Sequence, residues 1–266
     1  MKMTDKYLLY EASVQSPESD IEFIEKEYQT LYGSKPTELR EDFCGTGKLI
    51  YEWVQLSDEH KGLGIDLSTE PIESGRERYW EELNTTQKKR MKYVQGDVLK
   101  SEKHASQVVC AFNYSYCIFK DRSVLKKYFE AVRKSMPASG GMFVLDCFGG
   151  TESMMEGSES RTVESKKLGN FKYYWECERF NPLTHECFFS IHFKEKGQKK
   201  RKQVYTYDWR LWSTPELVDL LSEVGFSNIQ TYWEGDDEDG GGDGEFKATR
   251  EAENCLAWIS YIVATP

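Results

Sequence analysis

The chain has 266 residues, 39% of them hydrophobic, which is enough to bury the core of one large α/β domain or of a domain with an insert. Its formal net charge of −10 argues against a duplex nucleic-acid binder, which would need a basic face, but leaves room for a local basic groove. Seven cysteines stand at irregular spacings without a C-x-x-C pair, and the sequence pattern predicts neither a signal peptide nor a membrane-spanning stretch. These features predict a reduced, cytoplasmic protein that does not contact the membrane.

Residues 1–34 are predicted to form a helical extension. Ser16 and Pro17 begin a helix that ends at Gly33, and its apolar positions recur at helical spacing. The preceding segment carries Tyr7, Leu8 and Tyr10. These side chains either pack against a sheet or cover a bound ligand, and aromatic faces attract cations.

Residues 37–54 predict a strand, a tight glycine turn and a helix. The run Glu-Leu-Arg-Glu-Asp suits a short strand, and the helical spacing of apolar residues resumes at Leu49. Gly45 and Gly47 allow a ligand to approach the backbone, whose N–H groups are unpaired where the helix begins.

The next two predicted strands also end near acids. Residues 61–66 end in Asp66, and residues 92–98 include Asp97. Because the carboxyl ends of parallel strands meet at one edge of a sheet, Glu41, Asp66 and Asp97 are expected to line the same edge, where such folds bind ligands.

The segment from Glu41 to Gly47, Asp66, and the step Gly96-Asp97-Val98 resemble motifs I, II and III of class I S-adenosylmethionine-dependent methyltransferases. In layout the resemblance covers residues 35–148 and 213–264. The sequence departs from the family at Phe43, where the first glycine usually stands, and at Asp42, where an apolar residue is expected. A nicotinamide-binding motif would have a third glycine, which is absent here.

The resemblance implies S-adenosyl-L-methionine as the cofactor and assigns a part of it to each motif. The glycine loop would approach the methionine end, with Glu41 ordering the loop or binding the amino group, and Asp66 would accept hydrogen bonds from the ribose hydroxyls. Asp97 and Val98 would hold the adenine. The cofactor-binding residues implied are Glu41, Phe43, Cys44, Gly45, Gly47, Asp66, Leu67, Asp97, Val98, Asn113 and Tyr114.

The fourth predicted strand, residues 107–112, leads into Asn113-Tyr114-Ser115-Tyr116. By position this is motif IV of the resembled family, beside the transferred methyl group, although both prolines of the Asn-Pro-Pro-Tyr form are missing. The candidate catalytic residues are Asn113, Tyr10 and Tyr116; alternatively, Asn113 only caps a turn. A general base is needed only for a protonated acceptor, and Tyr10, Tyr116 and His192 are the candidates.

A helix over residues 121–136 and a fifth strand over 142–148 complete this half. Residues 149–212 then break the alternation of strand and helix, with antiparallel strands predicted at 171–180, 186–193 and 203–211. This insert is rich in aromatic residues. It is expected either to form a substrate lid or to pack against the sheet and make a homodimer contact.

The last part, residues 213–266, is predicted to contain one helix and two strands, over 226–233 and 255–264, around an acidic segment at 234–245. That segment fails the EF-hand template, so a flexible hairpin tip is expected, and no metal site is predicted. The fold expected is α/β: a Rossmann-like class I methyltransferase fold with a seven-stranded, mostly parallel sheet, an antiparallel last hairpin, and an antiparallel insert after strand five. Residues 35–148 and 213–266 would form its core.

The function expected is S-adenosylmethionine-dependent methyl transfer to the nitrogen or oxygen of a small molecule. A protein methyltransferase, aminopropyl transfer, and a cofactor-binding regulatory or interaction protein of the same fold are the alternatives.

Overall fold

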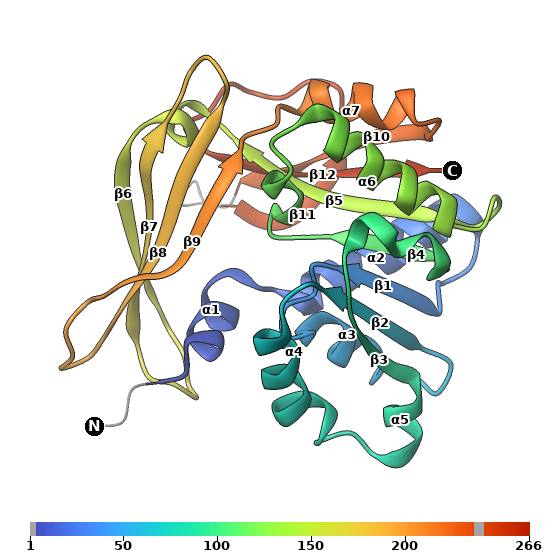
Figure 1. The fold of residues 1–266 in the computed structure, drawn as a ribbon, viewed down its shortest axis with the longest axis horizontal. Helices are drawn as coiled ribbons and strands as arrows, with labels where there is room; N and C mark the ends of the chain where they lie inside the picture. The colour runs from blue at the N-terminus through green and yellow to red at the C-terminus, as the bar shows by residue number, and fades with distance from the viewer. Residues whose placement is uncertain (1–3, 237–241) are drawn as a thin grey trace.

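An eight-stranded sheet forms the centre of the computed structural model, which describes residues 4–236 and 242–266 (Figure 1). The strand order is β11-β10-β12-β5-β4-β1-β2-β3. The strands are β1 (Glu38–Asp42), β2 (Lys61–Asp66), β3 (Met91–Gln95), β4 (Val108–Ala111), β5 (Met142–Gly149), β10 (Ser227–Asp236), β11 (Gly242–Ala248) and β12 (Trp258–Thr265). β1 to β5 run parallel to one another. The last three strands are antiparallel to their neighbours: β12 pairs with β5, β10 with β12, and β11 with β10.

Helices cover both faces of this sheet (Figure 1). α6 (Arg122–Ser135) and α7 (Thr214–Glu223) bury their apolar side chains on one face, and α2 (Pro17–Tyr32) and α3 (Lys48–Trp53) bury theirs on the other. The shorter elements are α4 (Thr69–Gly75), the π-helical turn η1 (Arg76–Trp80), α5 (Thr85–Arg90), and the 3₁₀ turns η2 (Val98–Lys103), η3 (Ser115–Ile118) and η4 (Thr151–Met154). None of the helices in residues 4–236 and 242–266 is long and apolar enough to cross a membrane.

The predicted sheet with its antiparallel closing strands is confirmed, but an eighth strand joins it. The acidic segment at 234–245 was expected to be a flexible tip, and this is wrong for its two ends. β10 continues through Asp236, and β11 begins at Gly242 and pairs with β10. The ring of Phe246 in β11 packs on Tyr261 at 4.2 Å between centroids, which provides the apolar anchor. Residues 237–241 lie outside the described residues.

The antiparallel insert is a separate sheet of four strands, in the order β6-β7-β8-β9. Its strands are β6 (Gly157–Val163), β7 (Phe171–Phe180), β8 (Glu186–Glu195) and β9 (Arg201–Arg210). The sequence predicted β7, β8 and β9 but missed β6. The reason is that β6 is an edge strand whose first six residues are exposed, so no apolar alternation marks it.

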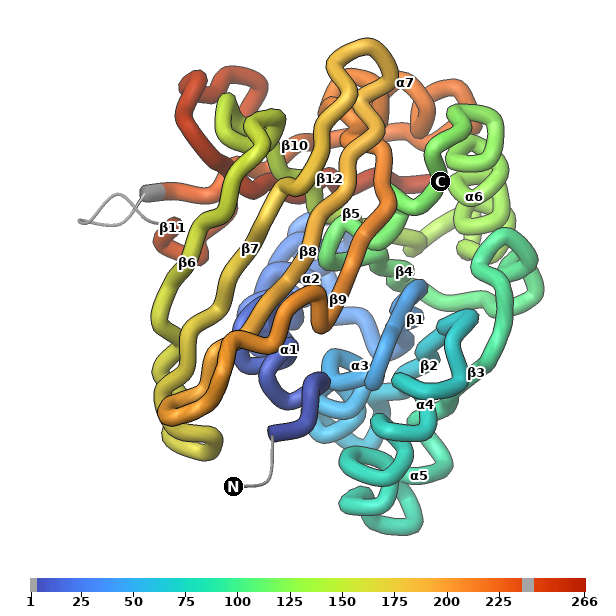
Figure 2. Tube along the Cα trace, turned by 60° about the vertical axis from the view of Figure 1, so that its left-hand side comes forward, coloured from blue at the N-terminus to red at the C-terminus, as the bar shows by residue number. Residues whose placement is uncertain are grey.

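The N-terminal helix α1 (Lys6–Val14) lies between the insert and the main sheet (Figures 1 and 2). Its Leu9 is fully buried with Ile191 and Phe193 of β8. On the opposite side Glu11 accepts hydrogen bonds from Thr46 and Tyr79 of the main domain. The helix therefore connects the insert to the edge of the sheet at which β1 ends.

Candidate functional site

The loop between β1 and α3 turns sharply at three residues with positive φ. These are Phe43 (φ 60°), Gly45 (53°) and Gly47 (69°). The turn is fixed by the N–H of Cys44, which donates to the carbonyl of Ile65, and by the N–H of Gly47, which donates to that of Cys44. Phe43 thus adopts the left-handed conformation that a glycine would supply at this position of the resembled motif.

The side of this glycine loop that faces α4 is tightly packed. A Cβ on Gly75 would lie 1.9 Å from the carbonyl oxygen of Thr46, so only glycine fits there. The same oxygen accepts a hydrogen bond of 2.7 Å from the hydroxyl of Tyr93. The hydroxyl of Thr46 donates to Glu11 at 2.6 Å. The loop is therefore held from α4, β3 and α1 at once.

The carboxylate of Glu41 is buried without a partner. The residue is only 4% exposed, and its Oε2 atom is inaccessible and makes no hydrogen bond to the described residues. Burial raises the pKa of Glu41 well above its ordinary value, and the nearby carboxylates of Asp20 and Asp66 raise it further. An unpaired buried carboxylate is costly unless a ligand satisfies it, and a cationic ligand fits this position.

Asp66 ends β2 and binds the glycine loop from the neighbouring strand. Its Oδ2 accepts from the N–H of Gly45 and its Oδ1 from the N–H of Ser68, both at 2.8 Å. The next side chain, Leu67, is 71% exposed, which is unusual for a leucine beside a buried sheet. Asp66 is half-buried, so its carboxylate can accept further hydrogen bonds from a ligand.

Asp97 follows β3 at the same edge of the sheet. One carboxylate oxygen accepts from the N–H of Leu99 at 2.9 Å and begins η2. Val98 is buried in the core that α6 covers, so less of its side chain is free for a ligand than that of Leu67. The structure thus brings Glu41, Asp66 and Asp97 to the ends of adjacent parallel strands, as the spacing predicted.

The polar residue Asp42, unexpected at its position, is part of a buried ion pair. Its carboxylate lies 3.0 Å from Nε of Arg40, two residues earlier on the same face of β1, and both side chains are fully buried. The hydroxyl of Tyr128 donates to the same carboxylate at 3.0 Å. Residues at i and i+2 of a strand share a face, which explains why Asp42 is tolerated beside Glu41 on the other face.

After β4 the chain turns through Asn113 and Tyr114, both with φ of 56°. Their N–H groups donate to the carboxylate of Asp146 in β5, at 2.7 and 2.9 Å, and the hydroxyl of Tyr116 donates to the carbonyl of Asp146 at 2.8 Å. The side chain of Asn113 makes no hydrogen bond to the described residues, so it does not cap this turn. The hydroxyl of Tyr116 has a structural role, because it bonds the carbonyl of Asp146 and the residue is deeply buried.

Tyr10 of α1 extends between the insert and the strand ends. Its ring packs on Tyr205 at 4.8 Å, and its hydroxyl interacts electrostatically with that of Tyr207. Burial raises the pKa of Tyr10 to about 12, and the carboxylates of Asp146 and Glu41 contribute to the shift. The hydroxyl therefore lies within electrostatic range of the ends of both β1 and β5.

The inner face of the insert presents an aromatic wall to the same region. The ring of Tyr114 packs on Phe148 at 4.4 Å, Phe148 on Phe189 at 6.0 Å, and Phe189 stacks on Trp175 at 4.7 Å. Tyr207 continues this wall toward Tyr10. A bound molecule above Tyr114 would meet aromatic faces and hydroxyls.

His192, a candidate base, lies elsewhere. Its neighbours Ile191 and Phe193 pack against α1, so alternation along β8 directs His192 to the outer face of the insert. There its Nε2 bonds Glu176 at 2.9 Å, and its Nδ1 accepts from the N–H of Gln203 at 2.7 Å. The proposal that His192 acts as the base is therefore wrong, because the ring points away from the aromatic wall.

Two residues that sequence reasoning missed organise this site. Asp146 holds the segment after β4, and Glu11 holds the glycine loop. A lone acid inside the apolar run of β5 was the available indication for Asp146, because a buried carboxylate requires partners.

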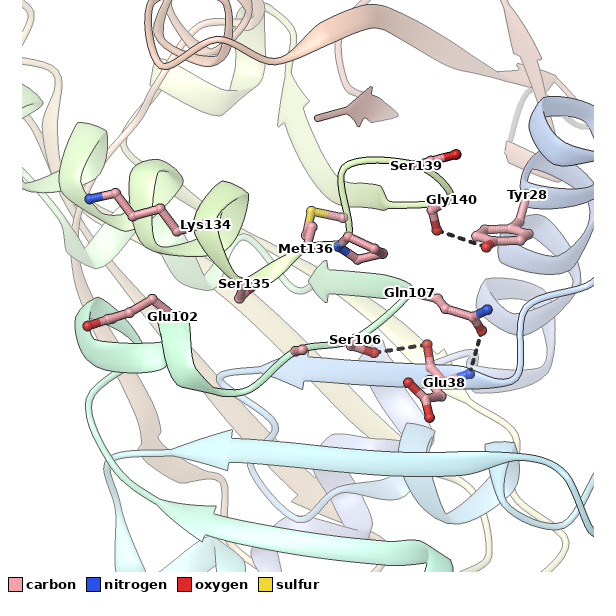
Figure 3. Close-up of a pocket in the computed structure, with 12 residues that line it drawn as sticks. Tyr28, Glu38, Glu102, Ser106, Gln107, Lys134, Ser135, Met136, Ser139 and Gly140 are labelled. Atoms are coloured by element: carbon pink, nitrogen blue, oxygen red, sulfur yellow. Dashed lines mark hydrogen bonds between the residues drawn. The ribbon is translucent and has the colours of Figure 1, made fainter.

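A cavity of about 470 Å³ lies at the amino ends of the strands, opposite the ends that carry the glycine loop (Figure 3). Its lining includes Glu38 at the start of β1, Gln107 just before β4, and Gly140 just before β5. These are the amino ends of the strands, so the cavity is separate from the site formed by Glu41 and Asp66.

No family model matches the sequence, and no curated protein matches it. Solved structures match along nearly the whole chain. The CcbJ methyltransferase from Streptomyces caelestis is 15% identical, with a TM-score of 0.66, over 96% of this chain and 92% of that one. The sugar N-methyltransferase KedS8 from a Streptoalloteichus species is 15% identical, with a TM-score of 0.64, over 100% and 94%.

A third match is CalS10, an amino pentose methyltransferase from Micromonospora echinaspora whose structure contains S-adenosylmethionine. It is 11% identical, with a TM-score of 0.68, over 100% of this chain and 98% of that one. Identities this low establish the architecture and leave the reaction to be argued from the site. The chain has the fold of the class I S-adenosylmethionine-dependent methyltransferases.

Proposed function

We propose that the protein is an S-adenosylmethionine-dependent methyltransferase that acts on the nitrogen or oxygen of a small molecule. The observation that carries this proposal is the buried, unpartnered carboxylate of Glu41 beside Asp66 and the glycine loop. Those residues fit a ligand with a cationic amino group and a ribose. When bound, the cofactor supplies a methyl group already activated on a sulfonium.

The residues that would hold the cofactor lie along the ends of β1, β2 and β3. Glu41 would bind the amino group, and the loop backbone from Phe43 to Gly47 would lie along the methionine end. Asp66 would accept the ribose hydroxyls, and the exposed Leu67 would cover an apolar face of the nucleoside. Asp97 would bind the adenine amine, with Val98 beneath it.

The protein's part in the reaction is to align the acceptor and exclude water. Asn113, Tyr114 and Tyr10 border the place where β4 and β1 end. The insert and α1 would act as a lid that closes this space with aromatic side chains. In this arrangement the acceptor would be bound by residues 1–34 and 149–212. The cofactor would be bound by residues 35–148 and 213–266.

The structural neighbours favour a small acceptor over a protein. KedS8 is a sugar N-methyltransferase and CalS10 an amino pentose methyltransferase, and the chain aligns with both over 100% of its length, including the insert. An amine is therefore the first acceptor class to test.

Isothermal titration calorimetry with S-adenosylmethionine and S-adenosylhomocysteine tests the cofactor assignment. The wild type should bind both, and Asp66→Ala should weaken binding about 10- to 100-fold, as expected when hydrogen bonds to a charged group are lost. Glu22→Ala, which removes an exposed acid on α2, is the control and should bind normally. Absence of binding to the wild type, or unchanged binding by Asp66→Ala, would refute the proposal.

Turnover is tested by measuring S-adenosylhomocysteine formation with a panel of amino sugars and of sugars in which a hydroxyl replaces the amine. Methylation of one class over the other identifies the acceptor atom. Cofactor binding without turnover of any small molecule would favour a regulatory protein of the same fold.

A further inference from the structure

Asp146 holds three of the five residues that follow β4, residues 112–116. Its Oδ2 accepts from the N–H of Asn113 at 2.7 Å and its Oδ1 from the N–H of Tyr114 at 2.9 Å. Its backbone carbonyl accepts from the hydroxyl of Tyr116 at 2.8 Å. The two side-chain bonds thus direct both N–H groups of one turn at one buried carboxyl group.

The turn that these bonds fix is conformationally unfavourable. Asn113 and Tyr114 are consecutive, neither is glycine, and both have φ of 56°. Asparagine adopts the left-handed region more readily than most L-residues do, whereas a tyrosine persists there only where its surroundings impose it. The carboxylate of Asp146 supplies that constraint, and the ring of Phe148, 4.4 Å from that of Tyr114, supplies a second one.

Asp146 itself is placed at a cost. It is 8% exposed, and among the described residues it forms no ion pair. Burial raises the pKa of Asp146 to about 8, although the two backbone hydrogen bonds oppose the shift. An apolar residue would fit an otherwise apolar strand more cheaply, so the carboxylate at this position points to a task beyond packing.

We propose that Asp146 is a positioning residue for methyl transfer, which fixes the left-handed turn at Asn113 and Tyr114 and thereby the side chains that face the acceptor. This inference rests on the proposed function. It assigns Asp146 to acceptor alignment, while cofactor affinity depends on Glu41 and Asp66.

The test compares Asp146→Asn with a matched control, Glu27→Gln. Both replace a buried carboxylate by its amide, but Glu27 accepts from the hydroxyl of Tyr232 at 2.7 Å and does not touch the turn. In Asp146→Asn the affinity for S-adenosylhomocysteine should stay within about 2-fold. The kcat/KM for the best amine of the panel should fall about 100-fold, the scale of a 1 Å misplacement. Glu27→Gln should leave both unchanged.

A spectroscopic readout separates this inference from the proposed function. In ¹⁵N-labelled protein the amide resonances of Asn113 and Tyr114 should both shift between wild type and Asp146→Asn, because an asparagine has one side-chain oxygen in place of the two that accept these bonds. In the wild type these two amides should also be strongly protected from hydrogen exchange despite lying in a loop, a measurement that does not require the variant to fold.

Two outcomes would overturn the inference. One is unprotected amides at Asn113 and Tyr114 in the wild type, or amide shifts that ignore the substitution. The other is parallel loss of cofactor affinity, kcat and melting temperature in Asp146→Asn, which would give Asp146 a purely structural role. If the wild type binds no cofactor, the proposed function fails, while the exchange measurement still decides whether Asp146 holds the turn.

Discussion

The hydroxyl of Thr46 donates a hydrogen bond of 2.6 Å to the carboxylate of Glu11. Thr46 lies in the glycine loop at the end of β1, and Glu11 lies on α1, which is otherwise packed on the insert through Leu9. The hydroxyl of Tyr79 donates to the same carboxylate. One side chain of the extension thus connects the proposed lid to the proposed cofactor loop.

Glu11→Ala should loosen α1 without unfolding the sheet. Both hydroxyls lose a charged acceptor, and such bonds contribute about 1.5–3 kcal/mol each, so the loss of both should make opening of α1 at least about 100-fold more frequent. Hydrogen exchange of the α1 amides and the dissociation rate of S-adenosylmethionine should both increase. Glu22→Ala, an exposed acid on α2, should change neither. Unchanged exchange in Glu11→Ala would show that α1 is held by the insert alone.

Gly75→Ala should displace the glycine loop. The added Cβ would lie 1.9 Å from the carbonyl oxygen of Thr46, and backbone cannot rotate away as a side chain can. We expect a loss of about 1–3 kcal/mol of unfolding free energy, typical of overpacking, and a marked loss of cofactor affinity. Gly157→Ala is the control, because nothing lies within 4 Å of its added Cβ. Denaturant unfolding and calorimetry measure the two effects, and equal behaviour of the two variants would contradict the prediction.

The strand ends that carry Glu41, Asp66 and Asp97 were predictable because their signals are local: a short apolar or alternating run, a glycine, then an acid. Phe43 was identified as a departure, and only the backbone reveals that it takes the glycine's conformation. The roles of Glu11 and Asp146 were not predictable, because each acts on a segment distant in sequence. A local pattern does not specify which loop a buried carboxylate will face.

Strands were missed for a different reason. β6 and β11 are edge strands with mostly exposed residues, so burial imposes no pattern on their sequences. Their positions are set by pairing with β7 and β10, which is a tertiary interaction. The exposed glycines and acids of β11 are typical of a loop, and that composition led to the wrong expectation.

Cofactor binding should release protons from Glu41. Burial raises the pKa of Glu41 well above its ordinary value in the free protein, so Glu41 keeps its proton to a higher pH than an exposed glutamate does. A bound ammonium favours the ionised form and lowers that pKa, and the proton passes to the buffer. Calorimetry in buffers of low and high ionisation enthalpy should therefore give different binding enthalpies for S-adenosylmethionine. The difference should disappear in Glu41→Gln.

5′-Methylthioadenosine, which lacks the amino acid part of the cofactor, is the matched ligand for this measurement. It should bind the wild type without releasing protons from Glu41. Proton uptake on binding S-adenosylmethionine, or equal release with both ligands, would exclude Glu41 as the partner of the amino group.

Asp146 should make folding stability fall as the pH rises toward 8. Burial raises the pKa of Asp146 to about 8 in the folded chain, whereas an unfolded Asp titrates near 3.9. Between these values the folded state keeps a proton that the unfolded state has lost. Stability therefore decreases by at most about 1.4 kcal/mol per pH unit from this group.

Asp146→Asn removes this contribution. From pH 5 to pH 8 the unfolding free energy of the wild type should therefore fall relative to that of the variant, by about 1 kcal/mol per pH unit. Asp20, whose charge contributes to the raised pKa of Asp146, is present in both proteins, and its own titration largely cancels in the difference. Urea unfolding at each pH gives the two free energies. A difference that does not change with pH would mean that Asp146 is ionised throughout, with its charge fully satisfied by the N–H groups of Asn113 and Tyr114.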